Sequence, residues 1–185
     1  MEKTEIRISV RSLVEFILRS GDLDSRRGTM DKEAMQKGSR LHRKIQRQMG
    51  SNYRPEVPLK YDIEYEDVVL RIEGRADGIF TEDGKTCIDE IKGVYRNVET
   101  LDSPVPVHRA QAMCYAFITA VQENQEELDV QMTYANLDTE EIRRFRETLS
   151  RTFLKNWFQD LADKYHKWVS YRQSWKEKRD ASMKN

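Results

Sequence analysis

The sequence predicts a single α/β domain in which a mixed central sheet of about five strands is flanked by helices. Three observations carry this prediction. Apolar residues alternate over 59–65 and over 128–134, which is typical of strands. An Asp-Gly turn at 83–84 separates two further strand-like runs. Four longer segments, at 6–20, 31–49, 107–121 and 154–168, instead space their apolar residues at helical intervals.

The composition limits the class of protein. The chain has 185 residues, enough for one domain with a substantial core, and its formal net charge is zero, so no overall basic field attracts nucleic acid. Residues 1–50 carry 12 Lys and Arg against 7 Asp and Glu, whereas residues 51–105 carry 7 against 13. This pattern fits a cation site beside a phosphate-binding surface, although ordinary solvated faces produce it as well.

Cysteine usage and hydropathy indicate a reducing, cytoplasmic setting. Cys87 and Cys114 are too few for a disulfide framework, and both lie among apolar residues, so we expect two buried thiols. The sequence shows no signal peptide and no apolar run long enough to cross a membrane, and we expect no membrane partner.

The first 50 residues are expected to form two helices. The first spans 6–20, with Ser9 or Ser12 near its start and Gly21 at its end. Residues 21–30 are expected to form a mobile loop. The second helix should run from Asp31, as its N-cap, to Met49.

The middle of the chain is expected to form an antiparallel meander. Residues 50–58 are predicted to be a connection, followed by a strand over 59–65, a turn at 66–67 and a strand from Val68 through 77–81. Residues 82–85 are predicted to form a hairpin turn, because Asp-Gly accepts the positive backbone angles that tight turns require. A third strand should then end at Lys92.

The C-terminal half alternates helix and strand. A loop over 93–104 should lead into the 107–121 helix, whose start is marked by Pro104 and Pro106, and then into the 128–134 strand. Residues 138–149 allow two interpretations, a helix by apolar spacing or a strand that pairs back after a turn at 138–139, and we slightly favour the strand. Beyond Ser170 the apolar pattern gives way to charged residues. We interpret 1–170 as one domain and 171–185 as a charged tail or linker toward a missing C-terminal domain.

The predicted hairpin brings chemically useful side chains together. Side chains two apart on a strand share a face, so Glu90 and Lys92 should point the same way, with Ile91 opposite and Asp77 beside them. Two carboxylates suit a hard cation such as Mg²⁺, and an ammonium group suits an activated water or a phosphate oxygen. A solvated charge pair is the alternative for Asp77 and Glu90 taken alone. Asp89 should point away and have a structural role.

Further motifs lie on the helices before and after this hairpin. Gly38-Ser39-Arg40-Leu41-His42 precedes it, and Gln111-Ala112-Met113-Cys114-Tyr115 follows it. In this order, with Asp77 thirteen residues before Glu90-Ile91-Lys92, the motifs over roughly residues 30–135 resemble the PD-(D/E)XK nuclease superfamily, and within it the RecB-like branch. Ala76 stands where the family name has proline, a departure that this branch commonly tolerates.

The resemblance implies a restriction-endonuclease-like core with a metal-dependent site. Asp77 and Glu90 would ligate Mg²⁺ or Mn²⁺, with His42 and the Ile91 carbonyl as further ligands. Imidazole shifts the preference toward Mn²⁺. Lys92 would orient or help deprotonate the attacking water. Some relatives carry an iron–sulfur cluster, but two cysteines cannot supply four ligands, so we expect no cluster.

The resemblance also implies contacts to DNA. Gln111 and Tyr115 share a helix face and would lie beside the site, contacting nucleic acid or positioning Lys92 and Glu90. Arg40 and Arg43 would belong to a phosphate track on the second helix. A polar helix–sheet contact and a solvated helix face are the plainer alternatives. His108, one turn before Gln111, is either a phosphate contact or a surface residue.

The expected function is that of a Mg²⁺- or Mn²⁺-dependent deoxyribonuclease, exonuclease-like on single strands or ends, in DNA repair or recombination. The segments at 8–17 and 165–169 resemble nuclease-like domains at the N-terminus of helicases related to the DinG and XPD group. A helicase in the same full-length chain is therefore an expected partner, although this sequence lacks the ATPase phosphate loop. The alternatives are a weakly active or inactive DNA-binding or docking module of a helicase, and an RNA or nucleotide hydrolase.

Overall fold

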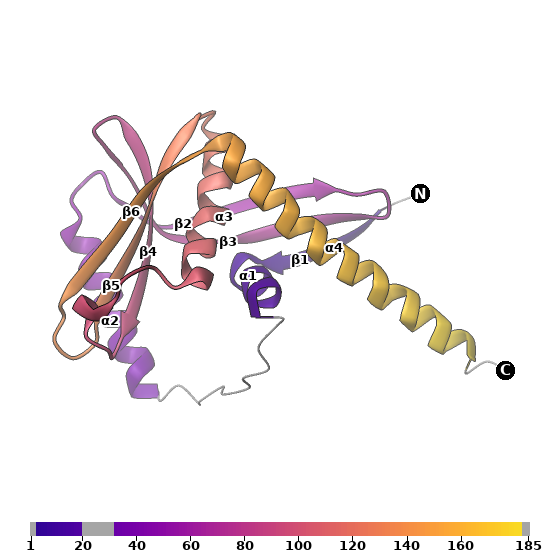
Figure 1. Ribbon diagram of the computed structural model, residues 1–185, viewed down its shortest axis with the longest axis horizontal. Helices are drawn as coiled ribbons and strands as arrows, with labels where there is room; N and C mark the ends of the chain where they lie inside the picture. Colours follow the sequence, from indigo (N-terminus) through magenta and orange to yellow (C-terminus); the bar gives the residue numbers. More distant parts are fainter. Residues whose placement is uncertain (1–2, 20–31, 183–185) are drawn as a thin grey trace.

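The computed structural model describes residues 3–19 and 32–182 and has an α/β fold (Figure 1). Its elements follow in the order β1 (Thr4–Ser9), α1 (Val10–Arg19), α2 (Lys32–Gln48), β2 (Arg54–Glu64), β3 (Val68–Glu82), β4 (Lys85–Val94), the short 3₁₀ helix η1 (Val98–Thr100), α3 (Pro106–Gln122), β5 (Glu127–Asn136), β6 (Ile142–Ser150) and α4 (Arg151–Ser182). One mixed sheet contains all six of these strands, so the predicted fold class is confirmed with one strand more than expected.

The long strand β3 organises the sheet, because it pairs with three other strands. Strand β2 runs antiparallel along it from Glu64↔Val69 to Arg54↔Ile79. On the other side, β1 runs parallel to it as far as Ser9↔Glu73, and β4 runs antiparallel to it only from Gly78↔Asp89 onward. Residues 74–77 of β3 therefore have neither β1 nor β4 paired beside them. The sheet opens at this point.

The other half of the sheet is built on β5. It pairs in parallel with β4, and β6 pairs with it in an antiparallel register. Strand β6 settles the ambiguity at 138–149 in favour of the strand. Strand β5 is buried along nearly its whole length, so it lies inside the fold rather than at a half-exposed face.

The two faces of the sheet are covered by different helices. Helices α1, α3 and α4 share the main core with the face that carries Ile88 and Met132. Helix α3 is buried on all sides from Ala110 to Ala120, not along one stripe as expected. On the opposite face, Leu41 and Ile45 of α2 pack against Ile91 of β4. The described residues contain no helix long and apolar enough to span a membrane.

The predicted turn at 82–85 is confirmed. Asp83 and Gly84 have φ angles of 51° and 77°, the left-handed values that a tight two-residue hairpin turn requires. Pro106 occupies the first turn of α3, as expected. Cys87 and Cys114 are both buried thiols, which confirms that part of the prediction.

Several predicted boundaries are wrong. The helix expected from residue 6 begins only at Val10, because Thr4–Ser9 forms β1, in which alternate side chains turn toward the core. Ser9 caps this helix, since its Oγ accepts a 3.0 Å hydrogen bond from the Ser12 amide. Strand β2 begins at Arg54, inside the predicted connection over 50–58. The predicted loop and cap at 21–31 lie outside the described residues.

The predicted tail at 171–185 is helical as far as the structure describes it. Helix α4 continues without a break to Ser182, and Figure 1 shows its last turns projecting beyond the sheet and the other helices. Tyr171 and Trp175 are exposed on this projecting part, where no core lies beneath them.

Candidate metal centre

Asp77 lies where the sheet opens, and the hairpin itself holds its side chain. The backbone pairing of β3 with β4 stops at Gly78↔Asp89. Immediately beyond it, Asp77 Oδ2 accepts a 2.7 Å hydrogen bond from the Ile91 amide. The side chain therefore continues the hydrogen-bonding of the two strands where the backbones separate, and its other oxygen, Oδ1, is left for a different partner.

Glu90 and Lys92 share a face of β4, as strand alternation predicts. Lys92 Nζ lies 2.7 Å from Glu90 Oε1, and the Glu90 side chain is 5% exposed. Its second oxygen, Oε2, is buried and has no hydrogen-bond partner among the described residues. Burial, and next the negative charge of Asp77, raise the pKa of Glu90 to about 7, although Lys92 and His42 act in the opposite direction.

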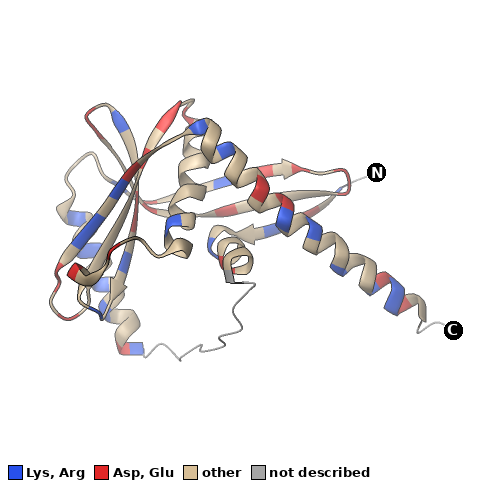
Figure 2. Cartoon of the chain, in the orientation of Figure 1, with Lys and Arg blue, Asp and Glu red and all other residues tan. Residues whose placement is uncertain are grey.

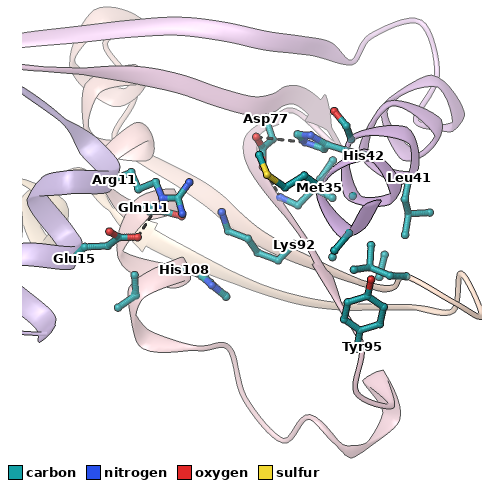
Figure 3. Close-up of a pocket in the computed structure, with 18 residues that line it drawn as sticks. Arg11, Glu15, Met35, Leu41, His42, Asp77, Lys92, Tyr95, His108 and Gln111 are labelled. Carbon is teal, nitrogen blue, oxygen red and sulfur yellow. Dashed lines mark hydrogen bonds and ion pairs between the residues drawn. The ribbon is translucent and has the colours of Figure 1, made fainter. Parts of the chain in front are cut away.

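His42 reaches the same place from helix α2. Its Nε2 lies 3.3 Å from Asp77 Oδ1, an ion-pair distance without the alignment of a hydrogen bond (Figure 3). Burial alone would lower the pKa of His42, but the carboxylates of Asp77, Glu56 and Glu90 outweigh it and raise the pKa. The imidazole thus faces a cluster of negative charge.

Glu56 belongs to this group, and sequence reasoning missed it. Ligand atoms of His42, Glu56 and Asp77 all lie within 4.8 Å of one another. The sequence placed Glu56 in a connection, whereas it lies on β2 directly opposite Asp77 in the register of the two strands. An acidic residue between Pro55 and Pro58, just before a strand, is the only signal in the sequence.

His42, Asp77 and Lys92 line one large cavity of about 890 Å³, whereas Glu56 and Glu90 are not among its lining residues. Asp77 and His42 lie on one side of it, and Lys92 extends across it. Arg11, His108 and Gln111 lie on the other side of Lys92, away from His42 (Figure 3). The cavity therefore joins a carboxylate–imidazole group to a set of hydrogen-bond donors.

Gln111 and Tyr115 differ in whether they reach the cavity. Gln111 is buried, lines the cavity and leaves its Oε1 without a hydrogen-bond partner among the described residues. Tyr115 is buried too, but it packs beneath β3: a Cβ at Gly74 would lie 2.6 Å from its hydroxyl. Tyr115 is not among the residues that line the cavity.

Arg40 and Arg43 are exposed on α2 and do not line the cavity. Figure 2 shows several basic residues along this helix. Two of its other cations make ion pairs: Lys37 lies 3.4 Å from Asp138, and Lys44 contacts Glu140. The basic face of α2 is thus partly neutralised by the turn between β5 and β6.

Asp89 faces the opposite side of β4 and has a structural role, as expected. It is fully buried and accepts hydrogen bonds from Tyr53 at 2.9 Å, Thr133 at 2.6 Å and Gln131 at 3.2 Å. Burial raises the pKa of Asp89, and the three donors offset part of this effect. The network holds β4 against β5 and the segment before β2.

The donor set fits a hard divalent cation. Two carboxylates and an imidazole are ligands that Mg²⁺ and Mn²⁺ accept, and the buried Oε2 of Glu90 has no hydrogen-bond partner among the described residues. The arrangement can hold a cation at one end of the cavity and present Lys92 beside it.

Comparison with known proteins bears on the fold alone. No protein-family model matches the sequence, and no curated protein matches it either. Among solved structures, the fold is similar to the crystal structure of SSO0001, with a TM-score of 0.57 over 88% of this chain and 78% of that chain. The sequences are 20% identical over this match. Similarity at this level shows a shared fold and does not extend to activity.

Proposed function

We propose that this chain is a metal-dependent DNA nuclease of the PD-(D/E)XK type, in the RecB-like branch. One observation supports this above the others: Asp77 and Lys92 line the same cavity as His42, and Lys92 is paired with the buried Glu90 at 2.7 Å. The motifs are far apart in sequence, and their convergence is what a hydrolytic metal site requires.

In this proposal the carboxylates of Asp77 and Glu90 hold the metal, together with His42 and the Ile91 carbonyl. When bound, Mg²⁺ or Mn²⁺ supplies Lewis-acid polarisation of the scissile phosphate and lowers the pKa of a water. Asp77 is already oriented by the Ile91 amide, so little rearrangement is needed before binding.

Lys92 carries the second part of the mechanism. Its ammonium group is held by Glu90 on a side chain that extends across the cavity, where it orients the attacking water and offsets negative charge as it builds on the phosphate. The ion pair limits the positions that the flexible lysine can adopt. Removal of Lys92 is therefore expected to reduce the rate of hydrolysis without abolishing the metal site.

The substrate proposed is DNA, with single strands or ends favoured, and a helicase as the working partner. Gln111 offers a buried amide to the cavity, and Arg40 and Arg43 offer exposed cations on the neighbouring helix. A chain of zero net charge gains little affinity from long-range attraction, which is consistent with delivery of the strand by a helicase.

The test is cleavage of labelled single-stranded, duplex and forked DNA by the purified chain with Mn²⁺, Mg²⁺ or EDTA. Cleavage that requires the metal supports the proposal. Salt-sensitive DNA binding without cleavage under any metal would contradict it and favour the DNA-binding module instead.

A further inference from the structure

We propose that Glu56 of strand β2 is a further side-chain ligand of the metal centre, in addition to Asp77, Glu90 and His42, and that His42, Glu56 and Asp77 form one binding group. This rests on the proposed function, because it concerns the same cation. It goes beyond that function by assigning a ligand from a strand outside the Asp77–Lys92 hairpin. Four observations carry it.

The first observation is the backbone of Glu56. Its φ angle is 54°, in the left-handed region that residues other than glycine, asparagine and aspartate rarely adopt. The backbone pairing of β2 with β3 passes from Pro55↔Gly78 to Val57↔Ala76 and leaves out Glu56 and Asp77, which lie opposite each other. The strand is therefore distorted at the one position that faces Asp77, and such distortions concentrate at functional sites.

The second observation is that Gln46 hydrogen-bonds to both strands at the distorted position. Gln46 Nε2 donates to Glu56 Oε1 at 2.9 Å and to the backbone carbonyl of Asp77 at 2.9 Å. Gln46 is itself buried and lies one turn after His42 on α2. Helix α2 thus supplies one ligand and, through Gln46, orients Glu56 and Asp77, which supply two more. Outer hydrogen bonds of this kind orient metal ligands.

The third observation is the spacing of the ligand atoms. Atoms from His42, Glu56 and Asp77 lie within 4.8 Å of one another, close enough for one ion to contact all three after a small adjustment. Glu90 is outside this group. Asp77 takes part in both arrangements, because Oδ1 faces His42 while Oδ2 accepts from the Ile91 amide.

The fourth observation is charge. Three carboxylates, Glu56, Asp77 and Glu90, act together on His42, and among the described residues the Lys92 ammonium makes an ion pair only with Glu90. The Glu90 side chain is 5% exposed, and its Oε2 has no partner among the described residues. A divalent cation balances this excess. An imidazole with two carboxylates favours Mn²⁺ over Mg²⁺.

The experiment is calorimetric titration of Mn²⁺ into the chain and into Glu56→Gln, which keeps the size of the side chain and removes its charge. Glu64→Gln is the matched control, because Glu64 is an exposed residue of the same strand. We expect Glu56→Gln to weaken Mn²⁺ binding by at least ~10-fold. Glu64→Gln should bind as the unmodified chain does. Without metal, Glu56→Gln should unfold at the same temperature or higher, because it removes a repulsive charge.

Glu56→Asn provides a second variant that tolerates the left-handed backbone, so the test does not depend on the folding of one protein. The inference is overturned if either folded variant binds Mn²⁺ as tightly as the unmodified chain, or if the unmodified chain binds no Mn²⁺. Calorimetry separates this outcome from the nuclease proposal. Glu56-dependent binding without DNA cleavage would refute the nuclease alone, and cleavage with unchanged Mn²⁺ dependence in Glu56→Gln would refute the ligand alone.

Discussion

Lys92 Nζ lies 2.7 Å from Oε1 of Glu90. The pair is largely buried, since 26% of the lysine side chain and 5% of the glutamate side chain are exposed. The Glu90 carboxylate is shielded from solvent, so its attraction holds the lysine side chain close to β4, the strand that carries both residues. The pair therefore limits the positions that the ammonium group of Lys92 can take in the cavity. It also makes the charge state of Glu90 a determinant of stability.

Glu90 should make the metal-free chain less stable as pH rises. Its pKa is about 7 in the folded protein and 4.5 in the absence of the fold. The folded state therefore binds this proton more tightly, and the stabilisation is fully present below pH 4.5 and lost as pH rises through 7. We expect the free energy of unfolding in EDTA to fall by roughly 2–3 kcal/mol between pH 5 and pH 8 through this group.

The variant Glu90→Gln isolates this effect. The raised pKa of His42 acts in the same direction. The comparison of the two proteins, by urea denaturation at both pH values, therefore measures the effect of Glu90 together with its influence on the pKa of His42. An identical slope in the two proteins would show that Glu90 does not carry a raised pKa.

Tyr53→Phe should destabilise the fold by about 1–3 kcal/mol, because it removes a hydrogen bond to the buried carboxyl group of Asp89. Urea denaturation measures the change. Tyr171→Phe is the control, since that ring is exposed on α4 and should change stability little. A Tyr53→Phe variant as stable as the control would mean that the remaining donors satisfy Asp89 unaided.

Two glycines should respond to alanine in opposite ways. A Cβ at Gly78 would lie 1.9 Å from the Tyr53 ring, so Gly78→Ala must displace that ring and should cost roughly 3 kcal/mol. A Cβ at Gly38 meets nothing within 4 Å, so Gly38→Ala should stabilise helix α2 by about 0.5–1 kcal/mol. Thermal unfolding of the two variants measures both effects. A change in stability in the same direction for both variants would contradict the prediction.

Gln111 and Gln131 are two buried glutamines with opposite expectations. Gln111 Oε1 has no partner among the described residues, so Gln111→Leu should leave stability unchanged or raise it by about 1 kcal/mol. Gln131 donates to Asp89 at 3.2 Å, and Gln131→Leu should cost about 1–3 kcal/mol.

The same two variants should rank the other way in DNA affinity: Gln111→Leu, the more stable variant, should bind DNA more weakly. We expect weaker binding of single-stranded DNA by Gln111→Leu than by Gln131→Leu, measured by fluorescence anisotropy on folded protein, because only Gln111 lines the cavity. Equal affinities would remove Gln111 from the binding surface.

Local sequence patterns predict the hairpin well and its neighbours less well. The Asp-Gly turn and strand alternation are enough to place Glu90 and Lys92 on one face with Ile91 on the other. Strand β1 was missed because it pairs with β3, more than sixty residues later, and no local period reports such a partner. The far end of α4 was missed because it lies against no core and so carries no apolar face to detect.

Glu56 shows a further limit of sequence reasoning about the site. Its place opposite Asp77 follows from the register of β2 with β3. Pro55 and Pro58 hide this part of β2 from sequence-based prediction, because proline rarely lies within a strand. His42 could be predicted because a helix motif marks it. Glu56 is brought to the site by tertiary pairing alone.

Cleavage of single-stranded DNA in Mn²⁺, compared among the unmodified chain, Lys92→Ala and Lys85→Ala, tests whether Lys92 acts in hydrolysis at this site. Lys85 lies on the same strand in a surface ion pair with Glu127, so its removal should change the rate less than twofold. Lys92→Ala should lower the rate by ~100-fold or more while Mn²⁺ still binds. If Lys92→Ala cleaves at the rate of Lys85→Ala, or if the unmodified chain shows no Mn²⁺-dependent cleavage, the site does not work as proposed.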